Sequence, residues 1–215
     1  MKHLPPEHLA TVAAKPPTRR TLAKLQTRAK VMTAARKLFS EQGYEGATIR
    51  DIAAVAGMST GAVFANFTDK ADLFREIVAD DQEALAGAMQ DAAGRGHNIE
   101  DSLLKVFMAG YTFYKSRLQL ARAAFSVYWD SQGGSSLRGL PSSSAPLDLF
   151  NAQLTAAIAN GELSEQSDVK LRSQMLFNTY LSNFPQAIFE GWSLEALQAR
   201  ARDQIRVLLA GARRG

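Results

Sequence analysis

The hydrophobic residues of this 215-residue chain recur at helical spacing along most of its length. Beyond Thr27, apolar positions repeat every three or four residues, and we find no segment with the strict alternation typical of a strand. The pattern therefore predicts an all-α protein, and Pro185 is expected to end or kink the helix that precedes it. The expected helices cover residues 27–42, 48–56, 59–66, 69–85, 101–115, 118–129, 147–160, 165–184 and 193–209.

Glycine, serine and threonine residues mark the ends of the short helices near the N-terminus. Gly43 and Gly57 stand where the first and second helices are expected to end, because glycine readily takes the left-handed conformation of a helix terminus. Thr48 and Asp51 have the spacing of a capping box, and Ser59 is suited to cap the third helix. A short helix, a glycine turn and a second short helix together indicate a helix-turn-helix.

The second helix of that unit has an apolar side and a small, polar side. Val63 and Phe67 are spaced i, i+4, so both can anchor the core and turn Thr60 and Phe64 outward. In a helix-turn-helix this helix lies in the major groove of DNA. An outward Phe64 packs on a sugar or a thymine methyl, or else it is a half-buried residue at the rim of the core. Part of the outward surface is expected from Gly61, Ala62, Ala65 and Asn66.

Charge is distributed unevenly along the chain. Between Lys15 and Arg50 there are nine basic residues and two acidic ones, a net charge of +7, against +4 for the whole chain. This imbalance favours contact between the N-terminal end and a polyanion, although a solvated basic face gives the same pattern. Residues 1–26 are proline-rich and predict a flexible basic arm, in which Arg19, Arg20 and Lys24 reach DNA or only solubilise the chain.

Several classes of function are excluded or disfavoured by composition. The chain has no cysteine, so disulfides, thiolate metal sites and a cysteine nucleophile are excluded. Its three histidines lie in proline-rich or glycine-rich stretches, and we expect no metal site, no cofactor and no catalytic residue. No apolar run is long enough to cross a membrane, and no signal-peptide core precedes Lys24, so a cytoplasmic protein is expected.

Residues 27–78 resemble the DNA-binding domain of the TetR family of bacterial one-component regulators. The motifs that carry the resemblance are Phe39 and Gly43, Ala47-Thr48-Ile49-Arg50-Asp51-Ile52-Ala53, Ala56-Gly57-Met58-Ser59, Gly61-Ala62-Val63-Phe64-Ala65-Asn66-Phe67, and Lys70 with Asp72-Leu73-Phe74. The resemblance implies an N-terminal three-helix DNA-binding domain over residues 27–78. A larger helical ligand-sensing and dimerisation domain is then expected over residues 79–215.

The resemblance also implies individual contacts with double-stranded DNA. Thr48 and Lys70 are expected to contact phosphates. The expected further contacts, to bases or phosphates or close to base edges, come from Arg50, Ser59, Thr60, Ala62 and Ala65. Phe64 stands where the family usually has a tyrosine whose hydroxyl meets a phosphate, and Asn66 stands where a histidine is common. Phe64 can preserve the packing of that tyrosine but not its hydrogen bond.

The remainder of the chain is rich in aromatic residues and carries no catalytic motif. Aromatic residues at helical spacing usually form a core, but a cavity between such helices is also a common small-molecule site. The candidates for a ligand pocket are Phe107, Tyr111, Tyr128 and Phe177. The resemblance implies a homodimer through the last two long helices. The apolar faces that suit it are Val169, Met175, Leu176 and Tyr180, and Leu194, Leu197, Ala201, Ile205, Leu208 and Leu209.

These observations favour a transcriptional regulator that binds a near-palindromic operator as a dimer and is released by an unknown small-molecule effector. An architectural DNA-binding protein without an effector is the first alternative, and the large second domain argues against it. A ligand-dependent activator is the second alternative, because the same fold permits it. An enzyme is disfavoured, since the chain has no phosphate-binding glycine loop and no pattern of catalytic side chains.

Overall fold

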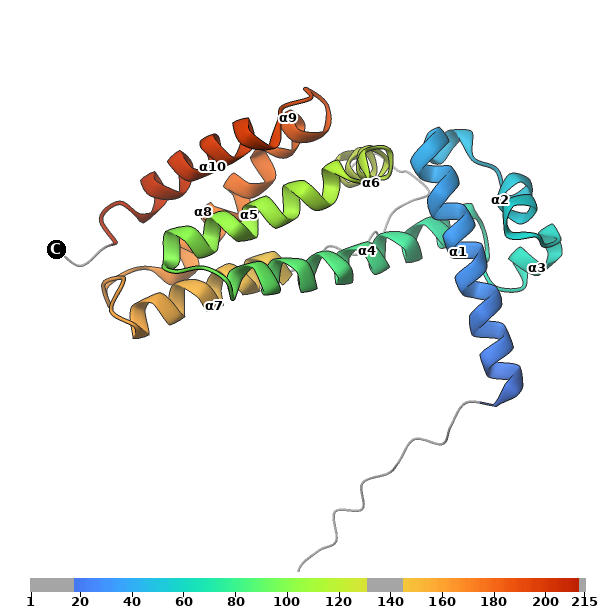
Figure 1. Cartoon of the computed structure of the whole chain (residues 1–215), viewed down its shortest axis with the longest axis horizontal. Helices are drawn as coiled ribbons and strands as arrows, with labels where there is room; N and C mark the ends of the chain where they lie inside the picture. The colour runs from blue at the N-terminus through green and yellow to red at the C-terminus, as the bar shows by residue number, and fades with distance from the viewer. Residues whose placement is uncertain (1–17, 131–144, 213–215) are drawn as a thin grey trace, which may run out of the picture.

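The computed structural model describes residues 18–130 and 145–212, and for residues 126–130 it describes the backbone alone. This part of the chain folds into ten helices without a strand, which confirms the all-α prediction (Figure 1). Their bounds are α1 Arg19–Gly46, α2 Ile49–Ala56, α3 Thr60–Phe64, α4 Lys70–Ala93, α5 Ile99–Lys115, α6 Leu118–Asp130, α7 Ala145–Ala159, α8 Val169–Ser182, α9 Phe184–Ile188 and α10 Leu194–Leu209.

Helix α1 begins well before the expected start at Thr27. The Thr18 hydroxyl caps it by accepting a hydrogen bond from the backbone N–H of Thr21 at 3.2 Å. A flexible arm over residues 1–26 is therefore wrong for residues 19–26, whose leucine, alanine, lysine and arginine residues are strong helix formers. Arg19, Arg20 and Lys24 are exposed on this helical extension, and residues 1–17 of the expected arm lie outside the described residues.

The first three helices and the beginning of α4 surround one hydrophobic core. Gly43, where the first helix was expected to end, has a φ of 76° and kinks α1, which continues to Gly46. Beyond the kink, α2 packs against α1 and α3 packs against α2, and the helix-turn-helix lies on the outer side of this domain (Figure 1). The buried residues of this core include Val31, Ala35, Leu38, Phe39, Ile52, Val63, Phe67, Leu73, Phe74 and Ile77.

The remaining helices form a second core dominated by aromatic rings. Helix α5 lies at its centre and packs against both α4 and α10, while α7 packs against α8. The helix expected up to residue 184 divides before Pro185, since α8 ends at Ser182 and α9 starts at Phe184. Asn183 lies fully buried at that junction, where its side chain donates to Tyr111 Oη at 2.9 Å and accepts from Arg200 Nε at 2.9 Å.

The two cores share helix α4 and are not joined by a linker. Residues Ala71 to Val78 of α4 belong to the N-terminal core, and Leu85 to Ala93 belong to the second core. Leu120 of α6 also packs into the N-terminal core. The domain boundary expected after Val78 thus falls inside one continuous helix. Among the described residues, no helix has the length and apolar composition needed to cross a membrane.

Candidate nucleic-acid interface and effector cavity

Helix α2 is capped at its N-terminus by a threonine side chain and at its C-terminus by a glycine. The Thr48 hydroxyl accepts from the backbone N–H of Asp51 at 3.2 Å and donates to the Asp51 carboxylate at 2.5 Å. The carboxylate therefore binds the threonine hydroxyl and not the backbone N–H of a full capping box. Gly57 ends the helix with a φ of 67° and a ψ of 37°, the left-handed conformation predicted for it.

Helix α3 presents the small, polar side that the sequence predicts. Ser59 Oγ caps it by accepting from the Ala62 N–H at 3.2 Å, while Val63 and Phe67 are buried in the core. Phe64 is 55% exposed, so its ring is a surface group and not a half-buried rim residue. The other predicted DNA-contact residues that are exposed here are Thr48, Arg50, Ser59, Thr60 and Ala65, whereas Ala62 is half-buried.

Two of the predicted DNA-contact residues are engaged within the domain instead. Lys70 Nζ donates to the carbonyl oxygens of Tyr44 at 2.9 Å and Ala47 at 3.3 Å, and it lies 4.3 Å from the centre of the Tyr44 ring. Asn66 Nδ2 donates to the Ala62 carbonyl oxygen at 2.9 Å, and its Oδ1 is buried without a partner among the described residues. Asn66 is thus half-buried with its amide bonded inside the domain, and Lys70 holds the end of α1 to the start of α4.

Arg28 of α1 holds the residues that directly follow α3, the helix expected to lie in the major groove and called the reading helix below. The sequence alone does not indicate this role. The Arg28 guanidinium lies 4.3 Å from the centre of the Phe67 ring, donates to the Asn66 carbonyl oxygen at 2.7 Å and pairs with Glu76 of α4. These contacts join three parts of the domain: α1, helix α4, and the residues that follow α3. By contrast, the exposed guanidinium of Arg50 makes no hydrogen bond or ion pair with the described part of the chain, so its charge is available to a ligand.

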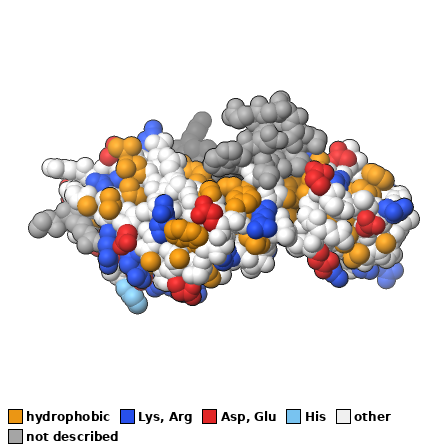
Figure 2. All heavy atoms as spheres, turned by 90° about the horizontal axis from the view of Figure 1, so that it is seen from above, with side chains coloured by type: hydrophobic (Ala, Val, Ile, Leu, Met, Phe, Trp, Pro, Cys, Tyr) orange, Lys and Arg blue, Asp and Glu red, His pale blue; other side chains and the backbone are white. Residues whose placement is uncertain are grey.

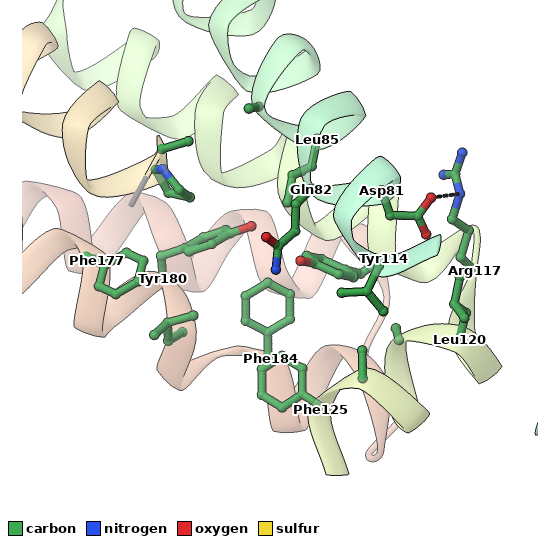
Figure 3. A pocket seen from close by; sticks show the side chains of 17 residues that line it. Asp81, Gln82, Leu85, Tyr114, Arg117, Leu120, Phe125, Phe177, Tyr180 and Phe184 are labelled. Atoms are coloured by element: carbon green, nitrogen blue, oxygen red, sulfur yellow. Dashed lines mark ion pairs between the residues drawn. The ribbon is translucent and has the colours of Figure 1, made fainter. Parts of the chain in front are cut away.

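A cavity of about 150 Å³ lies in the second domain, lined by residues of α4, the end of α5, α6, the start of α7, α8 and the start of α9 (Figure 3). Its walls are mainly apolar, and Phe184 lies centrally among them, 4.9 Å from the ring centres of both Tyr114 and Tyr180. The apolar lining residues include Val78, Leu85, Leu120, Phe125, Phe177, Leu181 and Phe184. The polar lining residues are Asp81, Gln82, Tyr114, Arg117 and Tyr180.

The predicted pocket residues divide between cavity and core. Phe177 lines the cavity, but Phe107 and Tyr111 lie behind its wall as fully buried core residues. Both rings pack against Tyr180, with centre-to-centre distances of 5.4 Å, which explains why they do not reach the cavity. The side chain of Tyr128 lies outside the described residues.

An ion pair links one edge of the cavity to the DNA-binding domain. The carboxylate of Asp81 in α4 accepts from Arg36 of α1, and Arg117 Nε lies 4.0 Å from it. Burial raises the pKa of Asp81 above its usual value, and the two arginines offset only part of that shift. Arg36 also pairs with Asp80 at 3.3 Å. A change in the position or charge of Asp81 would thus act directly on Arg36 of α1, the helix against which α2 packs.

Comparison with known proteins identifies the N-terminal domain. Residues 31–77 match the family described as bacterial regulatory proteins, tetR family. Over 103 residues the chain is 37% identical to the HTH-type transcriptional repressor AcnR of Corynebacterium glutamicum, covering 45% of this chain and 50% of the relative. Over 92 residues it is 33% identical to the HTH-type transcriptional repressor BepR of Brucella suis, covering 40% and 44%.

Residues 31–77 thus belong to the tetR family of bacterial regulatory proteins. The chain spans about half the length of these curated relatives. The complete fold is similar to that of the transcriptional regulator FadR from Bacillus subtilis in complex with stearoyl-CoA, with a TM-score of 0.67 at 21% identity. That match covers 85% of this chain and 98% of the other. The likeness in fold therefore includes both the N-terminal domain and the cavity-bearing body.

The cavity contains polar residues that the sequence alone does not identify. Gln82, Tyr114 and Tyr180 come from three separate helices, and nothing in their local sequence distinguishes them from core or surface residues. Figure 3 shows the hydroxyl groups of Tyr114 and Tyr180 and the amide of Gln82 pointing toward one another. Only the packing of α4, α5 and α8 brings them together. Burial raises the pKa of Tyr114 to about 12, with a smaller contribution from the charge of Asp81.

Proposed function

We propose that this TetR-family chain is a sequence-specific DNA-binding regulator that represses transcription until a small-molecule effector releases it. The observation that carries the DNA-binding part is the exposed edge of the helix-turn-helix. There the unpaired Arg50 lies in the same unit as Thr60 and the exposed ring of Phe64. A reading helix of this kind enters the major groove while the preceding helix crosses the backbone. We place this activity in the cytoplasm, where operator DNA is accessible.

Fluorescence anisotropy with duplexes that tile the region upstream of its own gene tests this proposal. The purified chain should bind one near-palindromic duplex at nanomolar concentration and a scrambled duplex far more weakly. Arg50→Ala should weaken specific binding by about tenfold or more, because a charged contact with DNA is lost. Arg95→Ala is a matched control, since it removes an exposed charge at the α4–α5 turn, far from α2 and α3 (Figure 1).

Salt dependence separates specific recognition from general attraction to DNA. Each phosphate neutralised by the protein should steepen the log–log dependence of affinity on salt by about 0.9. Equal and strongly salt-dependent binding to the scrambled duplex would contradict the regulatory proposal and favour an architectural DNA-binding protein. A footprint confined to one site, in contrast to diffuse coating, supports regulation.

The proposed homodimer uses the outer faces of α8 and α10. Most of the apolar residues expected to face the partner are instead buried in the chain's own core: Leu176, Tyr180, Leu197, Ala201, Ile205 and Leu209. The large apolar residues that these helices leave exposed are Leu171 (53%), Met175 (44%) and Val207 (74%). Figure 2, which includes the α10 side, shows hydrophobic side chains exposed between charged ones. A second copy burying this surface would place two reading helices side by side.

Light scattering coupled to size exclusion tests the dimer. The chain should elute with twice its monomer mass at micromolar concentration, and Val207→Glu should shift it to the monomer because a charge is buried unpaired. A wild-type monomer at that concentration would contradict the proposal.

Repression and effector release are supported by different observations. AcnR and BepR are described as repressors, and FadR forms a complex with stearoyl-CoA. In this chain the cavity and the Arg36–Asp81 pair connect the body with the DNA-binding domain. A reporter placed behind the operator should therefore be repressed by the wild-type chain. Activation of the reporter would favour the ligand-dependent activator.

A further inference from the structure

The hydroxyl group of Tyr180 is a buried polar group without a partner among the described residues at the cavity. The residue is 2% exposed, and Tyr180 Oη has no hydrogen-bond partner among the described residues. Buried hydroxyl groups are paired in the large majority of structures, because an unpaired one loses its hydration without replacement. A buried donor at the wall of a cavity therefore indicates a ligand that carries the matching acceptor.

Packing holds this hydroxyl group in a fixed position. The Tyr180 ring stacks on Tyr111 at 5.4 Å and meets Phe184 edge-on at 4.9 Å. Its hydroxyl lies so close to Gly110 that a Cβ at that position would be 2.0 Å from Oη. A glycine is thus required behind the hydroxyl, which is buried and points toward Gln82 and Tyr114 (Figure 3).

The charged residues at the cavity disfavour a charged ligand. Arg36 is already paired with Asp81 and is not free to bind a ligand carboxylate. A carboxylate entering beside Asp81 would instead be repelled by the negative charge of that residue. The Arg117 guanidinium lies 4.1 Å from the centre of the Phe113 ring and donates to Ser116 Oγ at 3.0 Å. Neither arginine extends a free cation into the apolar interior, and a buried charge without a partner is strongly unfavourable.

We propose that the cavity recognises a small, uncharged and mainly apolar effector with one carbonyl-type oxygen, to which the Tyr180 hydroxyl donates a hydrogen bond. This inference rests on the proposed effector-dependent function and names the chemical class of the effector. The volume of about 150 Å³ accommodates a molecule of the size of one aromatic ring. Phe177 and Phe184 supply apolar contacts to such a ring, and the hydroxyl supplies selectivity for the oxygen.

Four probes of nearly equal size test the inference by calorimetry on the full chain without DNA: acetophenone, ethylbenzene, benzoate and 1-phenylethylamine. Acetophenone should bind about tenfold more tightly than ethylbenzene, because only the ketone accepts the hydrogen bond. Benzoate and the amine should bind more weakly than acetophenone. Tyr180→Phe should abolish the preference for acetophenone and leave ethylbenzene binding within about twofold.

A matched control and a stability measurement distinguish recognition from damage to the fold. Tyr44→Phe, which removes a hydroxyl in the N-terminal domain, should leave binding of all four probes unchanged. Tyr180→Phe should have a melting temperature equal to or above that of the wild type, since it removes an unpaired buried hydroxyl. A lower melting temperature in Tyr180→Phe would overturn the inference, because the hydroxyl would then be satisfied within the protein.

The other contradicting results are equally direct. Equal binding of acetophenone and ethylbenzene, tighter binding of benzoate or the amine, no binding of any probe, or an unchanged preference in Tyr180→Phe would each overturn the inference. Because these titrations contain no DNA, their outcome does not depend on whether the chain binds an operator. Acetophenone binding without operator binding would contradict only the regulatory proposal, and operator binding without acetophenone binding would contradict only this inference.

Discussion

Replacing Arg28 with alanine should loosen the reading helix without removing a DNA contact. The substitution deletes the contact of the guanidinium with the Phe67 ring, its hydrogen bond to the Asn66 carbonyl oxygen and its pair with Glu76. The cation–π contact contributes about 0.5–1 kcal/mol and the hydrogen bond about 1 kcal/mol. The ion pair is partly exposed and contributes at most about 0.5 kcal/mol after solvent screening.

The expected loss for Arg28→Ala is therefore about 2 kcal/mol of unfolding free energy. For a chain of this length that corresponds to a melting temperature lower by roughly 4–8 °C in differential scanning calorimetry. Operator affinity should fall as well, because the backbone following α3 is no longer held against α1 and α4.

Arg50→Ala is the matched comparison for Arg28→Ala. Arg50 is exposed, so its replacement should change the unfolding free energy by less than about 0.5 kcal/mol while operator affinity falls. An Arg28→Ala protein that melts within about 1 °C of the wild type would refute the reasoning. If such a protein also lost operator affinity, Arg28 would be a direct DNA contact.

Three further predictions concern the interface and the core. Phe64→Asp should reduce operator binding by more than about tenfold without loss of stability, since the exposed ring would become a charge that repels phosphate; retention of binding would place Phe64 outside the interface. Asn183→Ala should lower the unfolding free energy in urea by about 3 kcal/mol, because Tyr111 and Arg200 lose their partner; a loss under about 1 kcal/mol would show that other groups replace it. Above pH 10 the unfolding free energy should fall, because the unfolded chain ionises its tyrosines first while burial raises the pKa of Tyr114 to about 12. At pH 11 this contribution is about 1.4 kcal/mol, and an identical pH dependence in Tyr114→Phe would contradict it.

Local chemistry accounts for what could be predicted from the sequence. Thr48, Gly57 and Ser59 determine the ends of α2 and α3 through contacts within a few residues, so those ends were predictable. The start of α1 is harder to predict, because the prolines before Thr18 and the basic residues after it form one continuous proline-rich and basic stretch, although the basic residues favour a helix.

Contacts between distant segments explain what could not be predicted. The spacing of Leu197, Ala201 and Ile205 shows that one side of α10 is buried, but not whether it packs on the same chain or on a partner. Tyr111 and Tyr180 are likewise both tyrosines on amphipathic helices. Only the packing of α5 against α8 and α9 decides that Tyr111 binds Asn183 while the hydroxyl of Tyr180 remains unpaired.

The continuity of α4 also has a mechanical consequence. Its 24 residues form a rod about 36 Å long, whose two halves are embedded in different cores. Because no hinge interrupts the rod, a tilt of about 5° imposed at one end displaces the other end by about 3 Å. That displacement is close to the spacing of successive base pairs. A rearrangement around the cavity that tilted α4 by this amount would thus move the N-terminal domain by about one base-pair spacing.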